Sequence, residues 1–452
     1  MTAYHATVAA TDRRIPPTAL HLAPGQNLRT GFQDFESAFA NVTSLERDLL
    51  TVASAVYACD LAFKRGEREE ITRDITLTLP VVNHQAFLSQ KDSLELLLWT
   101  LSHDNWSIEF VRDGGQPEPR LDWPSRQGVT ILFSGGVDSF VGTIKSLQQS
   151  GASGVQLVSH VTGNPVTQIS QNNLATHLAS HYGHGLRRVT VRTGGRNKSP
   201  FVFPSDSERE ETQRTRTFMF LAIAALAARR TGQHELVIIA ENGQMAIHLP
   251  LSPARIGAFS THTAHPEFVA CAIHFFSKVL DTDLTISNPF LYETKGEVVA
   301  RLDAKDRSVL SQSVSCWRGA RVRSFNHCGE CIPCLVRRIA FETNGIVLQE
   351  YKRDLLSMPN ILALPETDEG KRNLVEFAEF SHAFLTFSDA QLVDVFPDLI
   401  NSEFDTSRAI AMYRRFAGEA CAVLGRYPGP AALLPPVTHT PVKKQRKKGG
   451  KG

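Results

Sequence analysis

The chain has 452 residues and a formal charge of +2, from 48 lysines and arginines against 46 aspartates and glutamates. Six of the basic residues lie in the last ten positions, which contain no acid, so the rest of the chain carries −4. That sign excludes a general binder of the nucleic-acid backbone, which needs a basic face, and leaves only weak association through the tail. No stretch approaches the roughly 18 apolar residues of a membrane helix, so no membrane partner is expected.

The N-terminus lacks the basic-then-apolar pattern of a secretory signal, which predicts a cytoplasmic protein. Disulfides are disfavoured in that compartment. Seven cysteines are nevertheless present, and four of them fall within residues 316–334. Composition alone does not explain that clustering.

Residues 1–120 read as one α+β unit without a recognisable catalytic motif. Two of its segments read as helices, and in two others apolar residues alternate with polar ones, as in half-buried strands. These helices and strands are expected over residues 44–64, 75–79, 94–102 and 106–110. Residues 114–124 contain three prolines and two glycines and are a linker candidate.

From residue 128 onward, apolar strands and helices alternate along the chain. The expected strands cover residues 129–133, 155–161, 188–191, 235–240 and 284–287. The expected helices between them cover residues 139–149, 167–182, 212–230 and 267–280. This order predicts an α/β domain, residues 121–345, with a five-stranded parallel sheet covered on both faces. Ligands bind such sheets at the carboxyl ends of the strands, where this sequence is rich in Gly, Asn, Pro and Ser.

Residues 346–435 read as a helical C-terminal extension, with residues 374–387 and 407–424 as its clearest helices. Residues 436–452 form the basic tail, which its charge and the preceding prolines predict to be disordered and solvated. The α/β domain is thus expected to lie between two extensions.

A glycine-containing turn, Ser134-Gly135-Gly136-Val137-Asp138-Ser139, joins the first strand of that domain to its helix. Two glycines allow positive φ and close approach of a ligand to the backbone. Successive amide N–H groups at a helix start bind anions, and the two serine hydroxyls add donors. The turn therefore predicts a phosphate site in which Asp138 acts through Mg²⁺. The competing interpretation is an ordinary strand–helix turn.

Four cysteines, Cys316, Cys328, Cys331 and Cys334, have the spacing of a metal site. The two-residue gaps let neighbouring thiolates converge on one ion, and the longer gap supplies a loop that folds back. Four thiolates fill a tetrahedral Zn²⁺ site and leave no position for water, so a structural zinc knuckle is predicted. An iron–sulfur cluster, redox dithiols or no metal are the alternatives. The adjacent His327 is expected to be a bystander.

The glycine turn resembles that of the PP-loop ATP pyrophosphatases and is not a Walker A loop. In that family, which has a Rossmann-like HUP fold, the loop holds the β- and γ-phosphates of ATP while a carboxylate or carbonyl is adenylated. The turn and the cysteine cluster together resemble the QueC family of 7-cyano-7-deazaguanine synthases. The segment SCWRGARVRSFNHCGECIPCLVRR carries that family's HCGxCxxC pattern and the arginines after it. The resemblance covers residues 128–345.

The QueC resemblance implies a reaction and residue roles. ATP would adenylate 7-carboxy-7-deazaguanine, ammonia would displace AMP to give an amide, and a second ATP would drive dehydration to the nitrile. The loop would hold pyrophosphate, Asp138 would place Mg²⁺, and Lys295 or Arg216 would neutralise developing charge. Glu241 and Asn242, after the fourth strand, would contact the deazaguanine or the nucleotide. For Glu241, a helix-capping carboxylate is the alternative.

The chain departs from the QueC pattern in its two extensions, in the long first gap of the cysteine cluster, and in the segment HVTGNP after the second strand. These departures, and the element around Arg73, resemble QatC, the QueC-like group of the bacterial Qat anti-phage system. Such proteins occur with an ATPase, a QatB partner and a TatD-like nuclease. Added domains favour a QatB-like protein partner, whose amine would attack the activated carboxylate in place of ammonia.

Other functions are weighed against this one. A free 7-cyano-7-deazaguanine synthase would use ammonia, and a non-catalytic scaffold would only sense the nucleotide in a defence complex. The intact glycine turn disfavours the scaffold. The acidic body disfavours a tRNA thiolation enzyme, and Thr2 excludes an N-terminal-cysteine glutaminase.

Overall fold

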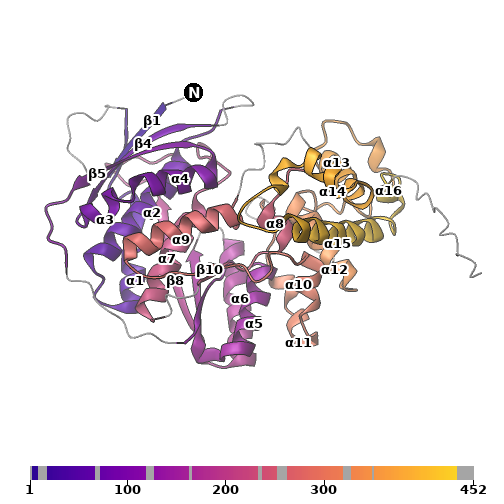
Figure 1. Cartoon of the computed structure of the whole chain (residues 1–452), viewed down its shortest axis with the longest axis horizontal. Coiled ribbons are helices and arrows are strands. Elements are labelled where there is room, and N and C mark those ends of the chain that lie inside the picture. The colour runs from indigo at the N-terminus through magenta and orange to yellow at the C-terminus, as the bar shows by residue number, and fades with distance from the viewer. Residues whose placement is uncertain are drawn as a thin grey trace, which may run out of the picture.

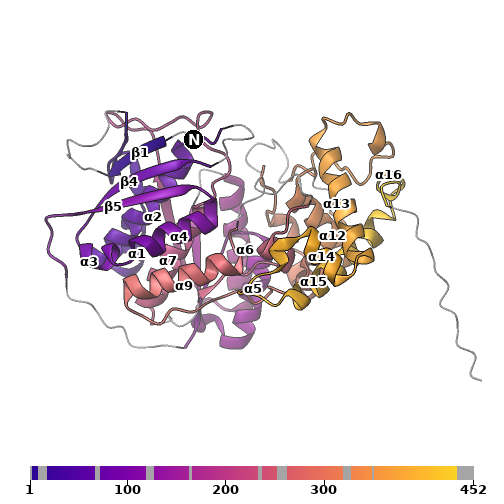
Figure 2. The ribbon, with the colours of Figure 1, turned by 45° about the horizontal axis from the view of Figure 1, so that its top comes forward.

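The computed structural model describes residues 3–8, 18–66, 72–118, 127–161, 165–232, 237–251, 262–318, 327–348 and 351–434. These residues form two β-sheets with their helices and a separate group of C-terminal helices (Figure 1). The N-terminal elements and the C-terminal helices lie on opposite sides of the central elements, as Figure 2 also shows. The basic tail predicted to be disordered lies outside the described residues, and so does most of the predicted linker.

The central sheet has the strand order β10-β9-β6-β7-β8-β3. Its parallel strands are β6 (Val129–Leu132), β7 (Val155–Val161), β8 (Arg187–Gly195), β9 (Val237–Ile238) and β10 (Ile286–Ser287). They confirm the predicted five-stranded parallel sheet. The sixth strand, β3 (Leu28–Thr30), comes from the N-terminal region and pairs antiparallel with β8, with Leu28 opposite Gly195. Three residues are too few to show alternation, so β3 is not predicted from the sequence.

Helices cover both faces of the central sheet. Alternate residues of one strand face opposite sides. Ile131 of β6 packs into a core with α5 (Val137–Ser150) and α6 (Pro165–Tyr182). The next residue, Leu132, packs into a core with α7 (Arg216–Arg230) and α9 (Pro266–Leu280). The glycine turn follows the carboxyl end of β6, and Glu241 and Asn242 follow that of β9.

The N-terminal region forms a second sheet of order β2-β1-β4-β5. Its strands are β1 (Ala3–Val8), β2 (Leu20–Leu22), β4 (Asp74–Val81) and β5 (Asn105–Arg112). All pairs are parallel, so the α+β class expected for this region is corrected to parallel α/β. Parallel neighbours require a crossover connection between consecutive strands, and the alternation of residues within a strand does not reveal that connection. The helices of this region are α1 (Phe32–Phe39), α2 (Ser44–Ala62), α3 (His84–Leu88) and α4 (Lys91–Ser102).

Buried ion pairs and a shared core join the N-terminal region to the central elements. Arg73 is 1% exposed and pairs with Asp60 at 2.6 Å and with Asp104 at 2.5 Å. Asp60 also accepts a hydrogen bond from the backbone N–H of Thr215, at the start of α7, at 2.8 Å. Residues of α2, α4 and β4 belong to the same hydrophobic core as α7 and α9. The element around Arg73 therefore has a structural role.

The C-terminal helices pack against the helix that follows the cysteine cluster. They are α13 (Glu369–Thr386), α14 (Asp389–Val395), α15 (Thr406–Leu424) and α16 (Pro428–Ala431). Their core includes one side of α12 (Ile332–Thr343) and residues beside α8 (Gly243–Ile247). Two short helices, α10 (Lys295–Ala300) and α11 (Ala304–Arg307), precede the cysteine cluster. Among the described residues, no helix combines the length and apolarity needed to cross a membrane.

Candidate functional site

The glycine turn connects β6 to α5, as predicted. Gly135 has φ of 86°, a left-handed conformation that favours glycine. Gly136 is the N-cap of α5, and no side chain caps the helix there. The first amides of α5 are therefore available to an anion.

Contacts from other elements hold the turn in place. The carbonyl of Gly135 accepts hydrogen bonds from Ser170 Oγ at 2.7 Å and from the backbone N–H of Val314 at 3.1 Å. The hydroxyls of Ser134 and Ser139 lie 3.2 Å apart, and Ser139 also donates to the Gly136 carbonyl at 3.0 Å. The bonds to Gly135 and Gly136 are accepted by backbone carbonyl groups of the turn and leave the amides at the start of α5 for a ligand. The shape of the turn is therefore formed by the protein itself.

Asp138 lies at the centre of a buried polar cluster. Its carboxylate is paired with Lys295 Nζ, and both residues are nearly buried, at 6% and 5% exposed. Lys295 is the first residue of α10, whose N-cap is Thr294. The fully buried Asn242 donates from Nδ2 to Asp138 Oδ1 at 3.2 Å. Three residues predicted separately from the sequence are thus brought together beside the turn.

Glu241 shares the amide of Asn242 with Asp138. Asn242 Nδ2 lies 2.9 Å from Glu241 Oε1, and Asn288 holds the Glu241 backbone from both sides, at 3.2 and 2.7 Å. Burial, followed by the charge of Asp138, raises the pKa of Glu241 to about 8, against the opposing effect of Lys295. The N-cap of α8 is Asn242, whose side chain accepts from the N–H of Met245, so the capping alternative for Glu241 does not hold.

The two carboxyl groups fit a divalent cation. Both lie within hydrogen-bond distance of the same amide nitrogen, so their oxygens lie close together. Mg²⁺ prefers carboxylate oxygens together with phosphate oxygens. Asp138 and Glu241 could hold such an ion next to the phosphate-binding amides, in exchange for the present ion pair with Lys295.

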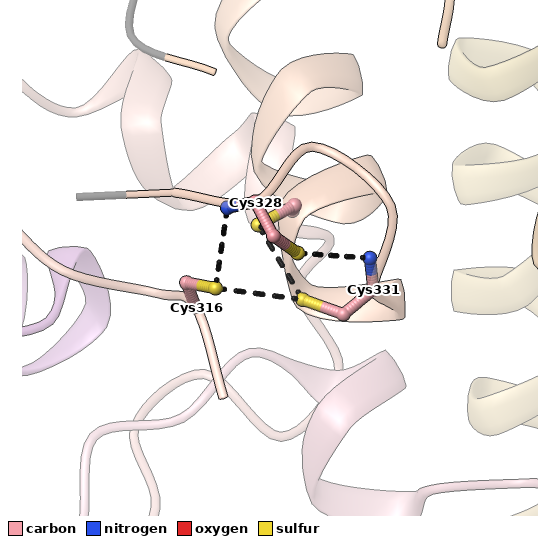
Figure 3. Close-up of side chains that lie close together, drawn as sticks. Cys316, Cys328 and Cys331 are labelled. Atoms are coloured by element: carbon pink, nitrogen blue, oxygen red, sulfur yellow. Dashed lines mark hydrogen bonds between the residues drawn. The ribbon is translucent and has the colours of Figure 1, made fainter. Parts of the chain in front are cut away.

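The four cysteines converge, as predicted, at the start of α12 (Figure 3). Their sulfur atoms all lie within 4.8 Å of one another, with separations of 3.4 Å between Cys331 and Cys334 and 3.9 Å between Cys328 and Cys334. Zn²⁺ about 2.3 Å from each sulfur requires sulfur–sulfur separations of about 3.8 Å. All four residues are buried, and the N–H groups of Cys328 and Cys331 point at neighbouring sulfurs at 3.4 Å. The group fits a structural zinc ion.

His327 is not part of that sulfur group. Its Nε2 accepts a hydrogen bond from the backbone N–H of Ser315 at 3.2 Å. Three residues after Cys334, Arg337 of α12 donates to Ser313 Oγ and to the Leu310 carbonyl, both at 2.8 Å. These bonds fix residues 310–315, the segment whose Val314 N–H holds Gly135. The cysteine cluster is therefore connected to the glycine turn through the backbone.

Comparison with known proteins also relates this region to the QueC family. Residues 128–345 match the family described as "Queuosine biosynthesis protein QueC". Relatives include the proteins named 7-cyano-7-deazaguanine synthase from Brucella ovis, Brucella suis and Brucella abortus. Each is 26% identical over 227 residues, covering 48% of this chain and 89% of the relative. The central region, just under half of the chain, is thus similar to QueC.

Two arginines lie at the beginning of α7, with Arg214 before its N-cap Thr215 and Arg216 as its first residue. Arg214 is 5% exposed and donates to the Ser102 carbonyl of α4 at 2.8 Å, which is a structural contact. The pKa of His160 is held well below its ordinary value by burial, followed by the nearby charge of Arg216. The predicted contact of Arg216 with developing charge stays a prediction.

Several residues that build the QueC-like site are not predicted from the sequence. Ser170 and Gln171, on α6, hold the carbonyls of Gly135 and Ser134, at 2.7 and 3.4 Å. Asn288, after β10, holds the Glu241 backbone. Polar residues after a strand are a general signal that marked the segment of Asn288. No local signal distinguishes Ser170 or Gln171 from other polar residues of a helix.

Proposed function

We propose that the protein uses ATP to activate a carboxylate of the 7-carboxy-7-deazaguanine type, with release of AMP, and transfers the acyl group to an amine. The observation that carries this proposal is the cluster of Asp138, Lys295, Glu241 and Asn242 beside the uncapped amides of the glycine turn. It lies within the region that is homologous to QueC. The proposal joins a phosphate site, a cation-holding carboxyl pair and a lysine at one point.

In the first step, a carboxylate oxygen of the acid attacks the α-phosphorus of ATP. The bond from that phosphorus to the oxygen bridging to the β-phosphate breaks, and pyrophosphate leaves. The amides of residues 137–139 bind the pyrophosphate. Asp138 and Glu241 are the residues that would hold a Mg²⁺ ion, which would supply positive charge against the phosphates. Lys295, released from Asp138, neutralises charge that develops in the transition state.

In the second step, an amine nitrogen attacks the acyl carbon. The bond from that carbon to the AMP oxygen breaks, AMP leaves, and the nitrogen releases a proton. Neither step requires a nucleophilic side chain, so catalysis depends on positioning and on charge. The chemistry is the same for ammonia and for a protein amine, and access to the site decides between them.

For the acceptor, we propose an amine of a partner protein, as in a QatC-like member of an anti-phage system. About half of the chain matches 89% of the length of the 7-cyano-7-deazaguanine synthases, so the remaining residues are additional to a whole small-molecule enzyme. Added folded regions next to a nucleotide site favour a macromolecular substrate. The QatB-like partner named by the resemblance is the first to test.

Mass spectrometry of intact proteins tests the acceptor. The protein and a QatB-like partner are incubated with ATP and 7-carboxy-7-deazaguanine, with Asp138→Ala as the inactive control. The expected result is one new adduct on the partner, equal to the acid minus water, that depends on ATP. Formation of a free amide or nitrile with ammonia, and no adduct, supports a free synthase instead. Absence of AMP under every condition supports a nucleotide-sensing scaffold.

A further inference from the structure

The C-terminal helix α15 contacts the short segment that presents Lys295 to Asp138. Thr294 Oγ1 donates a hydrogen bond to Glu419 Oε1 at 2.6 Å. Arg415 donates from Nε to Glu297 at 2.6 Å and from Nη2 to the Tyr292 carbonyl at 2.8 Å. Both α15 residues lie outside the region that matches QueC, which ends at residue 345. The extension therefore reaches the site through residues 292–297.

Gly296 shows how closely the carboxyl group of Glu419 approaches this segment. A Cβ atom at Gly296 would lie 2.6 to 2.7 Å from the three carboxyl atoms of Glu419. Such a distance is well inside van der Waals contact, so only glycine lets the carboxyl group rest on the backbone. The contact lies one residue from Lys295.

The apolar side of the segment is held separately, because Val298 and Val299 are fully buried in the core that contains α5. α10 is only six residues long, and helices of that length are not stable without tertiary contacts. Its described contacts include Asn344 Nδ2 of α12, which donates to the Gly296 carbonyl at 2.9 Å, and its own capping box of Thr294 and Glu297. The two capping residues are the ones that Glu419 and Arg415 bind. Contacts from α15 thus act on the residues that define the first turn of α10.

We propose that the C-terminal extension positions the site lysine, because Glu419 and Arg415 hold the first turn of α10 in the orientation that brings Lys295 Nζ to Asp138. Glu419 and Arg415 are positioning residues that act through Lys295. The inference rests on the proposed function for its kinetic consequences alone. Its structural part, the placement of Lys295, is measurable without any activity.

Two measurements test the proposal on the full-length protein. The first is AMP formation with ATP and 7-carboxy-7-deazaguanine, with kcat and KM for ATP separated. The second is acetylation of Lys295 by an amine-reactive ester, quantified by peptide mass spectrometry. Thermal unfolding accompanies both. Wild type is expected to show slow labelling of Lys295, because that side chain is buried and paired.

The variants are chosen as matched sets. Gly296→Ala places a methyl group against Glu419, Glu419→Leu removes the acceptor, and Glu419→Gln keeps it. Arg415→Ala is compared with Arg414→Ala on the same helix, since Arg414 pairs with Asp389 and bonds to the Phe387 carbonyl, away from α10. Gly296→Ala and Glu419→Leu are expected to lower kcat about 10- to 100-fold, the cost of a displacement near 1 Å, with a smaller change in KM.

Labelling of Lys295 should rise several-fold in the same two variants and in Arg415→Ala, while Glu419→Gln and Arg414→Ala resemble wild type. If Gly296→Ala and Glu419→Leu fold normally but leave labelling and kcat unchanged, the proposal is overturned. If labelling rises although even wild type forms no AMP, positioning is supported and the proposed function fails. If Gly296→Ala or Glu419→Leu does not fold, the labelling of Lys295 in Arg415→Ala is compared with that in Arg414→Ala. Each of these two arginines forms an exposed ion pair, so neither substitution is expected to unfold the protein.

Discussion

The two extensions are joined to the QueC-like region by different kinds of contact. The N-terminal region shares a hydrophobic core with α7 and α9 and inserts buried charges, such as Asp60 at the start of α7. It even contributes a strand to the central sheet. The C-terminal helices form a core of their own with α12, and their polar contacts reach the segment of Lys295.

This difference separates two effects that truncation would mix. Changes in the N-terminal contacts are expected to alter the free energy of unfolding and leave the kinetics of the folded protein intact. Changes at Glu419 or Gly296 are expected to alter kinetics with little loss of stability. The cysteine cluster is expected to affect both stability and kinetics. Its helix α12 belongs to the C-terminal core, and residues 310–315, which α12 binds, hold the glycine turn.

The largest effect is expected from loss of the metal. Removing a zinc ion from the cysteine cluster would leave four buried thiols without their metal, and the binding energy of a structural zinc is folding energy. A chelator, or Cys334→Ser, should release about one zinc per chain and lower the unfolding temperature by more than 10 °C. Because Val314 holds Gly135, ATP affinity should fall as well. Elemental analysis, calorimetry and nucleotide titration measure these quantities. If the protein without zinc were as stable as the protein with zinc, the structural role would be contradicted.

The next largest effect is expected at Arg73. Arg73→Leu leaves the buried carboxylates Asp60 and Asp104 with Arg65 as their remaining ion-pair partner, which costs up to about 3 to 5 kcal/mol of unfolding free energy. Urea denaturation measures the loss, and Arg414→Ala, which breaks an exposed pair, should change stability by no more than about 1 kcal/mol. The kcat of folded Arg73→Leu should match that of wild type. A large fall in kcat at unchanged stability would place catalytic importance in the N-terminal region instead.

The smallest effect is a pH dependence from Glu419. Burial raises the pKa of this carboxyl group to about 7; Thr294 and Arg415 act in the lowering direction and Glu297 in the raising one. Because the folded state holds a proton that the unfolded state releases, stability falls as pH rises from about 4.5 to above 7. Glu419→Gln removes that loss, so its unfolding temperature should exceed that of wild type by a few degrees at pH 8.5 and converge with it at pH 5. Equal differences at both pH values would show that Glu419 does not titrate in this range.

Much of the fold follows from local patterns in the sequence. The strands β6 and β7 and the helix between them were predictable because burial on both faces favours apolar residues in a strand, although β7 also buries Gln156, Ser159 and His160. The glycine turn and the cysteines were predictable because their chemistry needs particular residues at fixed spacing. The N-terminal class was not, since alternation identifies a strand but does not say whether its neighbour is parallel. The role of Glu419 was hidden because 125 residues separate it from Thr294, and no local pattern marks such a contact.

The most direct test of the central claim is AMP formation by wild type and Asp138→Ala. Both proteins are incubated with ATP, Mg²⁺ and 7-carboxy-7-deazaguanine, with an amine acceptor present, and their folding is compared by circular dichroism. The predicted result is AMP release by wild type that depends on the acid and falls at least 100-fold in a folded Asp138→Ala variant. Equal AMP release by the two proteins, or none by wild type with the acid present, would contradict the account.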